Sequence, residues 1–417
     1  MTAFKKADIL LPHGVDLSKW SVVACDQYTS QADYWEDVEK IVADNPSTLN
    51  ITFPEIYLSE GDKRIEKINK TMDKYMEMGI FKKYPQSLIY VERTIDGKKV
   101  RRGVVGAIDL EKYDFSVGSE SLVRATEGTV LERIPPRVKI RENAPLELPH
   151  VMILIDDEAC EVIEHLTPIT FLMEKIYDFE LIKGGGHLTG YLIPDEIADQ
   201  VIEKISAFEN QDIFNKKYGI TDKSPLAYAV GDGNHSLATA KTCWENLKKT
   251  LTPEEIENHP ARFALCEIEN IHETALEFEP IHRVVFNVDV DDLLENLGKF
   301  YDLSDNPKDG QCIHYISEKG EGKVYVKNTK SQLTVGTLQI FLDQYLKGKS
   351  SEIDYIHGDD VCKDLGAKPG NIGFILPPMA KSDLFLGVIK DGVLPRKTFS
   401  MGEAYEKRFY LEAKLIK

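Results

Sequence analysis

The 417-residue sequence lacks the features that define several large classes of protein. Its six cysteines lie far apart and include no Cys-x-x-Cys pair, which favours reduced thiols over a disulfide framework and predicts that no zinc is bound. No apolar run approaches the roughly 18 residues of a membrane span, and the N-terminus has no signal-peptide core. We therefore expect a soluble, cytoplasmic protein with no membrane partner.

The sequence also has too little positive charge for a typical nucleic-acid-binding protein. Lysine and arginine total 51 against 69 aspartates and glutamates, so the net charge is −18, and the acidic excess is spread along the chain. Binding to DNA without sequence preference needs concentrated Lys and Arg, so nucleic acid is an unlikely partner. Nothing in the composition indicates the oligomeric state.

A chain of this length exceeds one ordinary core, and we divide it into regions 1–115, 116–290 and 291–417. Asp96-Gly97 between two apolar runs predicts a hairpin in the first region. In the second region, Gly184 to Gly186 is most simply a hairpin turn, because the Lys-Ser/Thr of a Walker A loop is missing. A single helix is expected from Pro194 to about Tyr218.

The stretch Ala227 to Lys248 is the clearest local pattern in the chain. A short apolar run breaks at Gly231-Asp232-Gly233, and apolar residues then recur at the three-and-four spacing of one helix face. This predicts a strand, a tight loop and a helix. Such a loop presents backbone N–H groups and the positive end of a helix dipole to one point, where an anion gains roughly 0.3–1 kcal/mol from the dipole.

The residues of this loop favour a ligand site. Gly231 and Gly233 allow left-handed backbone angles, while Asp232, Asn234 and His235 bring polar groups to the same place. The alternative is that glycine and asparagine only make a turn and that His235 caps the helix.

Residues 124–145 hold a second candidate segment, in which four arginines accompany Glu127. Pro135-Pro136 rules out one continuous helix here, so the segment is expected to be a loop that faces a ligand. The planar fork of arginine suits phosphate or carboxylate, although a solvated charged linker is the competing interpretation. The residues concerned are Arg124, Glu127, Arg133, Arg137 and Arg141.

Further polar residues lie in the last part of the chain. His282 and Arg283 follow a predicted buried strand, and His357 precedes Asp359 and Asp360. His357, Asp359 and Asp360 could bind Mg²⁺ together, but capping of the following helix is the better explanation for the two aspartates.

Four runs, taken in order, resemble the bacterial and archaeal family known as domain of unknown function 1015. The family's Asp-Gly-His-His-Arg-Tyr-x-Thr-Ala run corresponds to 232–240, with Asn234 in place of a histidine and Ser236 in place of an arginine. Its Arg-x-His-Glu-x-Thr run corresponds to 124–129, with Thr126 in place of a histidine. The remaining runs match at 281–283 and 394–398. These departures indicate a divergent branch.

The Asp-Gly-x-His element also resembles the ParB and sulfiredoxin superfamily, which includes archaeal free-serine kinases. The resemblance implies an α+β fold with a ParB/sulfiredoxin-like core and α/β additions at both ends. It implies Mg²⁺ and ATP or ADP as cofactors, with Glu127 as the base for a substrate hydroxyl. It further implies catalytic roles for Asp232 and His235, and a metal role for Asp232 and, more weakly, His357. Phosphate would contact Gly231, Gly233, Asn234, Ser236, Arg124, Arg133, His282, Arg283 and Lys397.

Together these features predict a nucleotide-dependent phosphotransferase that acts on a small hydroxylated metabolite, with free serine as one candidate. The alternatives are a ParB-like regulatory switch that binds nucleotide without acceptor turnover, and a ParB-like nuclease. The acidic net charge disfavours the nuclease. The catalytic prediction assumes that Glu127 and His235 meet in space.

Overall fold

The computed structural model describes residues 2–148 and 151–417. The chain forms two compact units, which we describe separately: unit 1 holds residues 1–125, 129–276 and 402–417, and unit 2 holds 126–128 and 277–401. No helix in the described part of the chain has the length and apolar character needed to cross a bilayer.

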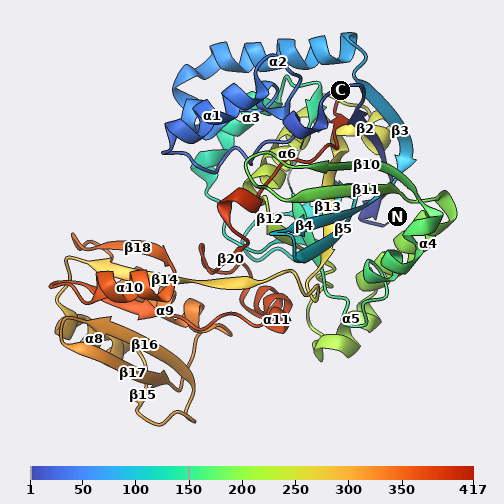
Figure 1. The fold of residues 1–417 in the computed structure, drawn as a ribbon. Coiled ribbons are helices and arrows are strands. Elements are labelled where there is room, and N and C mark those ends of the chain that lie inside the picture. Colours follow the sequence, from blue (N-terminus) through green and yellow to red (C-terminus); the bar gives the residue numbers. More distant parts are fainter. Residues whose placement is uncertain (1, 149–150) are drawn as a thin grey trace. The chain divides into compact units, whose positions relative to one another are not determined.

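Unit 1 is built on a mixed sheet of ten strands in the order β10-β11-β4-β5-β13-β9-β12-β7-β6, with β1 paired to β5 (Figure 1). Most neighbours are antiparallel, whereas β12 and β6 run parallel to β7, and β13 runs parallel to β9. The strands are β1 (Phe4–Lys5), β4 (Ile89–Ile95), β5 (Lys99–Asp109), β6 (Tyr113–Asp114), β7 (Val123–Ala125), β9 (Met152–Ile155), β10 (Glu174–Glu180), β11 (His187–Leu192), β12 (Tyr228–Asp232) and β13 (Phe263–Asn270).

Both faces of this sheet are buried, because successive side chains of a strand point to opposite faces. On β5, Val104 and Ile108 enter one apolar cluster, whereas Val105 and Ala107 enter another on the opposite face. Two short ladders complete the unit. They pair β2 (Ala7–Pro12) with β3 (Phe81–Ser87), and β21 (Lys414–Leu415) with β8 (Leu146–Glu147).

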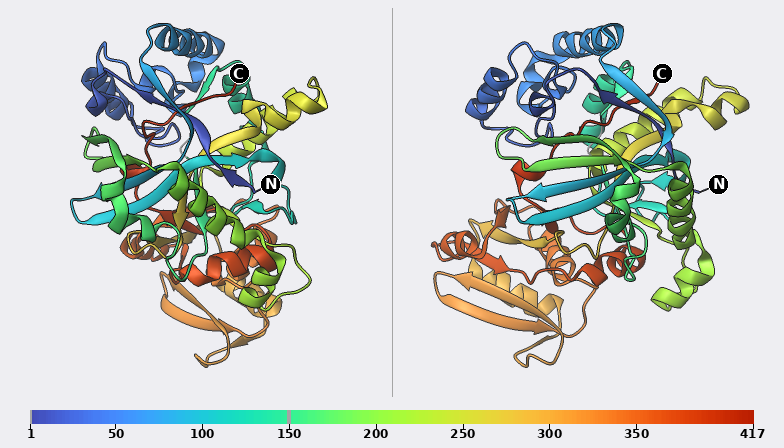
Figure 2. Two further views of the ribbon diagram at one scale, coloured as in Figure 1. Left: turned by 90° about the vertical axis from the view of Figure 1, so that its right-hand side faces the viewer. Right: turned by 45° about the vertical axis from the view of Figure 1, so that its right-hand side comes forward.

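The helices of unit 1 pack around this sheet, and those of the first eighty residues lie together at one end of the unit (Figure 2). Their amphipathic faces bury apolar side chains, as in α2, where Ile68, Met72 and Tyr75 are buried. The helices are α1 (Ala32–Val42), α2 (Gly61–Glu77), α3 (Ile134–Arg141), α4 (Asp195–Ser206), α5 (Gln211–Tyr218), α6 (Asn234–Lys248) and α7 (Pro253–Asn258).

The predicted strand, loop and helix are confirmed as β12, a turn at Gly233 and α6. Gly233 has φ 83°, the left-handed angle that glycine adopts without strain, whereas Gly231 lies inside β12. Leu237, Ala240 and Trp244 of α6 pack into the core, so the amphipathic face was identified correctly. The helix therefore begins at a fixed point directly after a buried strand.

Two local predictions were wrong. Residues 124–145 do not form one loop, because α3 begins at Ile134 and holds both prolines in its first turn, where a missing N–H costs no helical hydrogen bond. The single helix expected from Pro194 is two helices, because Asn210 accepts hydrogen bonds from the N–H groups of Asp212 and Ile213 and so caps α5.

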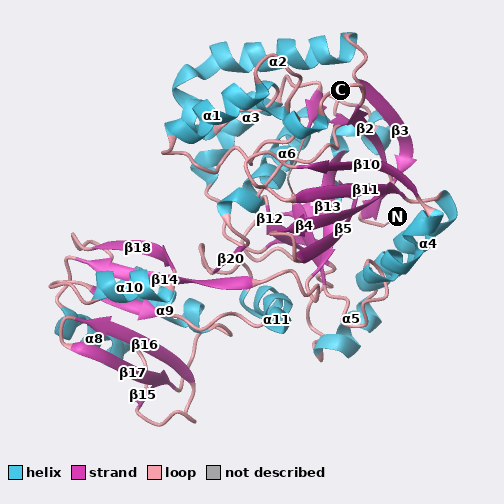
Figure 3. Cartoon of the chain, in the orientation of Figure 1, coloured by secondary structure: helices cyan, strands magenta, loops and turns pink. Residues whose placement is uncertain are grey.

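Unit 2 contains a sheet in the order β15-β17-β16-β19-β14-β18, with β20 paired to β14 (Figure 3). Its strands are β14 (Phe278–Phe286), β15 (Leu303–Ser304), β16 (Gln311–Ser317), β17 (Gly320–Val326), β18 (Glu352–His357), β19 (Ile372–Ile375) and β20 (Phe399–Met401). Its helices are α8 (Val290–Phe300), α9 (Thr334–Tyr345), α10 (Asp359–Gly366) and α11 (Lys381–Asp391).

Both predicted hairpins are present. Asp96 and Gly97 have φ 50° and 65° between β4 and β5, and Gly184 to Gly186 lie in the turn between β10 and β11. The division into three regions stays a prediction about domains, although β5 of the first region pairs along its length with β13 of the second.

Candidate functional site

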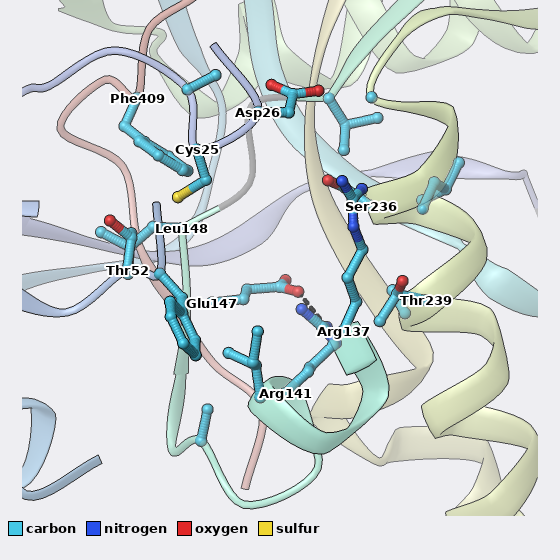
Figure 4. A pocket seen from close by; sticks show the side chains of 18 of the residues that line it. Cys25, Asp26, Thr52, Arg137, Arg141, Glu147, Leu148, Ser236, Thr239 and Phe409 are labelled. Atoms are coloured by element: carbon cyan, nitrogen blue, oxygen red, sulfur yellow. Dashed lines mark hydrogen bonds and ion pairs between the residues drawn. The ribbon is translucent and has the colours of Figure 1, made fainter. Parts of the chain in front are cut away.

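Unit 1 contains a cavity of about 410 Å³ at the start of α6. Its walls come from the β12–α6 turn, from α3, from loops at 24–26 and 51–53, and from residues 144–148. Phe409, near the C-terminus, also lines the cavity (Figure 4). The volume lies within the range of about 300–1,000 Å³ that is usual for small-molecule sites.

The N-terminus of α6 forms one wall of this cavity and is open to a ligand. Gly233 is the N-cap residue, and no side chain caps this end of the helix. Its own N–H group donates to Asp232 Oδ1 at 2.8 Å. Ser236 lies in the first turn, is exposed and lines the cavity. The uncapped N–H groups and the helix dipole favour a bound anion here.

Helix α3, which packs against α6, also contributes arginines to the cavity wall. Arg133, Arg137 and Arg141 recur at intervals of four residues, so they lie along one side of the helix, and all three line the cavity. Arg141 pairs with the buried carboxylate of Glu147, and Arg137 pairs with Glu55. Arg137 and Ser236 enter the cavity from two different helices (Figure 4). The charges of Arg133 and Arg137 act on His235 in the first turn of α6, so these two arginines lie near the anion-favouring end of that helix.

The rest of the cavity is largely apolar. Leu146, Leu148 and Val151 line it together with Phe53 and Phe409. Such walls suit a flat, weakly polar group such as a nucleobase, because burying apolar area is worth about 25 cal/mol per Å². The cavity thus joins an anion-binding end to an apolar recess.

Cys25 and Thr52 supply polar atoms within this recess. Burial raises the pKa of the Cys25 thiol to about 12, so the group is a neutral thiol at pH 7 rather than a nucleophilic thiolate. The Thr52 hydroxyl donates to the carbonyl of Thr48 at 2.7 Å. Neither side chain has the geometry of a catalytic nucleophile with an adjacent base.

Two acidic residues, Asp26 and Asp232, lie at the cavity, and one of them already has a cationic neighbour. Asp26 and Asp232 both line the cavity, and Mg²⁺ usually takes one or two carboxylates together with phosphate oxygens and waters. Asp232 Oδ2 lies 3.2 Å from Lys407 Nζ, so this carboxylate already has a cationic neighbour. The predicted metal role of Asp232 remains a proposal.

His235, the second residue of α6, does not cap the helix. Its Nε2 accepts a hydrogen bond from the Val130 N–H group at 3.3 Å. Burial, together with the charges of Arg137 and Arg133, lowers the pKa of His235 to about 4. At neutral pH the ring is therefore uncharged, with its proton on Nδ1.

We expect NMR titration of the His235 ring to show no protonation between pH 7 and pH 5. Because the folded-state pKa lies below the unfolded value of about 6.5, the unfolded chain binds this proton more readily. His235 therefore contributes stability that is full above about pH 6.5 and is lost as the pH falls toward 4. In His235→Gln the melting temperature should therefore fall less between pH 6.5 and pH 4 than it does in the native protein. A ring that titrates near pH 6.5 in the folded protein would contradict the assignment.

Arg124 has a structural role that the sequence did not reveal. It is buried in β7, and its guanidinium donates to the carbonyls of Ser121, Ser224 and Pro225 at 2.8, 2.8 and 3.2 Å. It does not belong to the residues that line the cavity. Its donors hold the chain before β12 instead of facing a ligand.

Several predicted site residues belong to unit 2. Glu127 Oε1 accepts a hydrogen bond from the Lys397 N–H group at 3.3 Å. Arg283 is fully buried and donates to the carbonyls of Lys397 at 2.8 Å and Arg396 at 3.2 Å. Burial lowers the pKa of Arg283 to about 10, and the Glu127 charge acts in the opposite direction. These residues fix the segment before β20 beside Glu127.

The two histidines of unit 2 differ in environment. His282 is buried, accepts from the Leu376 N–H group through Nδ1 at 3.1 Å, and lies 2.9 Å from Asp359 Oδ1 through Nε2. His357 is exposed at the end of β18. Asp359 and Asp360 lie in the first turn of α10, where their charge favours the helix, but neither side chain caps it.

One further group in unit 1 has the spacing of metal ligands. Asp156, Glu158 and His272 each offer an atom within 4.8 Å of the others. Lys217 Nζ lies 2.9 Å from Asp156, and the Tyr218 hydroxyl donates to the same carboxylate at 2.6 Å. A lysine ammonium thus already neutralises the carboxylate that a metal would need.

Sequence reasoning overlooked the ligand-facing role of α3 and of distant residues such as Thr52, Glu147 and Phe409. The four-residue spacing of Arg133, Arg137 and Arg141 is a helical signal in the sequence. It was hidden because Pro135 and Pro136 were taken to interrupt a helix rather than to begin one.

The fold described above is of the α+β class, and comparison with known families identifies the family of the chain. The model of the family "Protein of unknown function (DUF1015)" matches residues 10–345. The chain belongs to this family, which confirms the resemblance inferred from the four runs. No curated protein matches the sequence significantly.

The solved structures that match this chain do so weakly and share little sequence with it. A free serine kinase in complex with AMP is 11% identical, with a TM-score of 0.38 and coverage of 76% of this chain and 93% of that one. A conserved hypothetical protein from Pyrococcus furiosus is 13% identical, with a TM-score of 0.35 and coverage of 77% and 97%. SbnI from Staphylococcus aureus, with a C-terminal truncation, is 10% identical, with a TM-score of 0.36 and coverage of 72% and 83%. At these identities and TM-scores, the matched structures do not indicate a function for this chain.

Proposed function

We propose that this protein binds a nucleotide in the unit 1 cavity and transfers phosphate to a small hydroxylated metabolite, with free serine as one candidate. The nucleotide's phosphates lie at the N-terminus of α6, and its base lies in the apolar recess. The phosphates are thus bound by charge at one end of the cavity, and the base is bound by its fit to apolar walls at the other.

One observation carries this proposal: an uncapped helix N-terminus, an arginine-bearing helix and an apolar recess border the same cavity. Arg133 and Arg137 can donate in a planar fork to phosphate oxygens, and the α6 N–H groups add further donors. Arg137 and Arg141 are already paired with Glu55 and Glu147, so of the three arginines the exposed Arg133 is the most accessible to a ligand.

In this proposal the chain's residues bind and orient the reacting groups. Arg133 and Arg137 neutralise the charge that develops on the transferring phosphoryl group. Asp26 and Asp232 would hold Mg²⁺, which supplies charge neutralisation when bound with the nucleotide. His235 is uncharged at neutral pH and does not line the cavity, so its predicted catalytic role stays a proposal. The family resemblance implies that Glu127, a residue of unit 2, is the base for the substrate hydroxyl, and the kinetics of Glu127→Gln test that role.

A thermal-shift series with ADP, ATP, CTP and pyrophosphate, each with Mg²⁺, tests nucleotide binding. A ligand at one hundred times its dissociation constant should add about 2.7 kcal/mol to the stability of the folded chain. Arg137→Gln should greatly reduce this shift, because a charge-assisted hydrogen bond is lost. The matched control is Lys139→Gln, which removes a charge from an exposed residue of the same helix. If no nucleotide shifts the melting temperature, the proposal fails.

Acceptor chemistry is tested separately with Glu127→Gln. Radiolabelled phosphate should pass to serine or another hydroxylated metabolite in the native protein, and the rate should fall at least a hundredfold in the variant while nucleotide affinity stays within twofold. Glu279→Gln, an exposed glutamate of β14, is the control. Nucleotide binding without transfer to any acceptor would instead support a regulatory switch.

A further inference from the structure

An aspartate lies at the end of the cavity that favours anions. Asp232 is the last residue of β12, directly before the Gly233 turn and α6, and it lines the cavity. Its Oδ1 accepts from the Gly233 N–H group at 2.8 Å, so the carboxylate is held at the start of the helix. A carboxylate in this place would by itself repel a phosphate. An anion that binds here therefore needs a positive charge beside Asp232.

Lys407 of the C-terminal segment supplies such a charge. Its Nζ lies 3.2 Å from Asp232 Oδ2, and the two side chains are 22% and 24% exposed. Lys407 directly follows a short 3₁₀ helix, Ala404–Glu406, and is distant from Asp232 in the sequence. Water and salt screen a partly buried pair less than a pair at the surface. The ammonium group therefore offsets the negative charge at the start of α6.

The main chain around Lys407 is fixed by pairing with the segment that leads into the cavity loop at 24–26. The Lys407 carbonyl accepts from the Ala24 N–H group at 2.7 Å, and the Phe409 N–H group donates to the carbonyl of Val22 at 3.0 Å. The two segments run antiparallel. Phe409, two residues after Lys407, itself lines the cavity. The Lys407 side chain thus starts from a fixed point at the edge of the site.

The described residues that line the cavity carry more negative than positive charge. Five of them are acidic and three are arginines. Two lysines that contact the acidic residues make up the difference, because Lys414 lies 3.5 Å from Glu147 and Lys407 lies 3.2 Å from Asp232. Lys407 is the one of these two at the start of α6. The acidic residues are Asp26, Glu55, Glu132, Glu147 and Asp232, and the arginines are Arg133, Arg137 and Arg141.

We propose that Lys407 allows nucleotide phosphates to bind at the start of α6 without a metal, because it neutralises Asp232. This role rests on the proposed function and specifies the form of its ligand, the metal-free nucleotide. The ammonium group occupies the side of Asp232 that a magnesium ion would need. Mg²⁺ is then required for phosphate transfer and not for binding. Lys407 is a positioning residue, since it acts on the phosphate through Asp232.

Calorimetric titration of the full chain with ADP, pyrophosphate and adenosine in excess EDTA tests this role. The native protein should bind ADP and pyrophosphate under these conditions. In Lys407→Gln the affinity for both should fall about tenfold or more, because Asp232 is left without its counter-charge. Adenosine carries no charge, so its affinity should be the same in the two proteins. The matched control is Lys216→Gln, an exposed residue of α5, which should bind all three ligands as the native protein does.

Two further variants separate the charge of Lys407 from its contribution to the fold. Lys407→Arg keeps the positive charge and should keep most of the native affinity for metal-free ADP. The double variant Lys407→Gln/Asp232→Asn removes both charges together. It should return the affinity to within about threefold of the native value, because the two residues act as a coupled pair. A loss in Lys407→Gln that the double variant does not recover would overturn the proposal.

The same titrations distinguish the role of Lys407 from nucleotide binding as such. If the native protein binds ADP only when Mg²⁺ is present, the role of Lys407 is refuted and nucleotide binding in the cavity is retained. Equal affinity of Lys407→Gln and the native protein for metal-free ADP has the same meaning. No binding with or without Mg²⁺ refutes both. If Lys407→Gln does not fold, the native protein in EDTA and the double variant decide.

Discussion

Substituting Ser236 with glutamate is expected to weaken nucleotide binding at least a hundredfold while leaving the protein folded. Ser236 is exposed in the first turn of α6, where an acidic side chain interacts favourably with the helix dipole. The same carboxylate would occupy the place of the phosphate and repel it. Calorimetric titration with ADP and ATP measures the loss of affinity, and thermal melting measures the stability.

The matched control is Asn246→Glu, which adds the same charge to an exposed residue of the same helix, more than two turns from its start. This variant should bind nucleotide as the native protein does. Ser236→Arg offers a change in the opposite direction, because it restores the arginine of the family's run. Its affinity should rise about tenfold, since a charge-assisted hydrogen bond is worth roughly 1.5–3 kcal/mol. Unchanged binding in Ser236→Glu would show that phosphate does not lie at α6.

The turn between β12 and α6 could be predicted because the residues that define it lie close together in the sequence. Gly233 provides a left-handed angle at one position, and the apolar spacing of Leu237, Ala240 and Trp244 defines one helix face. Both signals are complete within a window of fifteen residues. The hairpin at Asp96-Gly97 was predicted on the same basis.

The remaining walls of the cavity depend on tertiary packing. Thr52 and Phe409 are separated by most of the chain, and neither has a distinctive neighbourhood in the sequence. Arg124 and Arg133 look equivalent in the sequence, yet one is buried against carbonyl groups and the other lines the cavity. Burial decides which arginine is available to a ligand, and burial is set by strands that pair across the whole chain.

The unit to which Glu127 belongs could not be predicted from the sequence either. Glu127 belongs to a three-residue segment of unit 2, although the residues on either side of that segment belong to unit 1. A motif match identifies the residue type, but the unit to which it belongs follows only from long-range contacts. The catalytic assignment therefore depends on the kinetic test of Glu127→Gln rather than on its place in the sequence.

The largest effect on stability is expected for Trp244→Ala. Trp244 is fully buried in the core of unit 1, and its indole N–H donates to Glu111 Oε1 at 2.5 Å. Removing such a side chain leaves a cavity and costs about 3–5 kcal/mol, which corresponds to a fall of roughly 10 °C in melting temperature for a unit of this size. Scanning calorimetry or urea unfolding measures the loss.

The control Trp244→Phe separates packing from hydrogen bonding. It keeps most of the buried apolar area but removes the indole donor, and Glu111 retains Lys248 as a partner at 2.8 Å. We therefore expect a cost of about 1–2 kcal/mol, well below that of alanine. Equal losses in the two variants would mean that the hydrogen bond to Glu111, rather than burial against the sheet, fixes α6. The position of the helix N-terminus, and with it the anion-binding end of the cavity, would then depend on one polar contact.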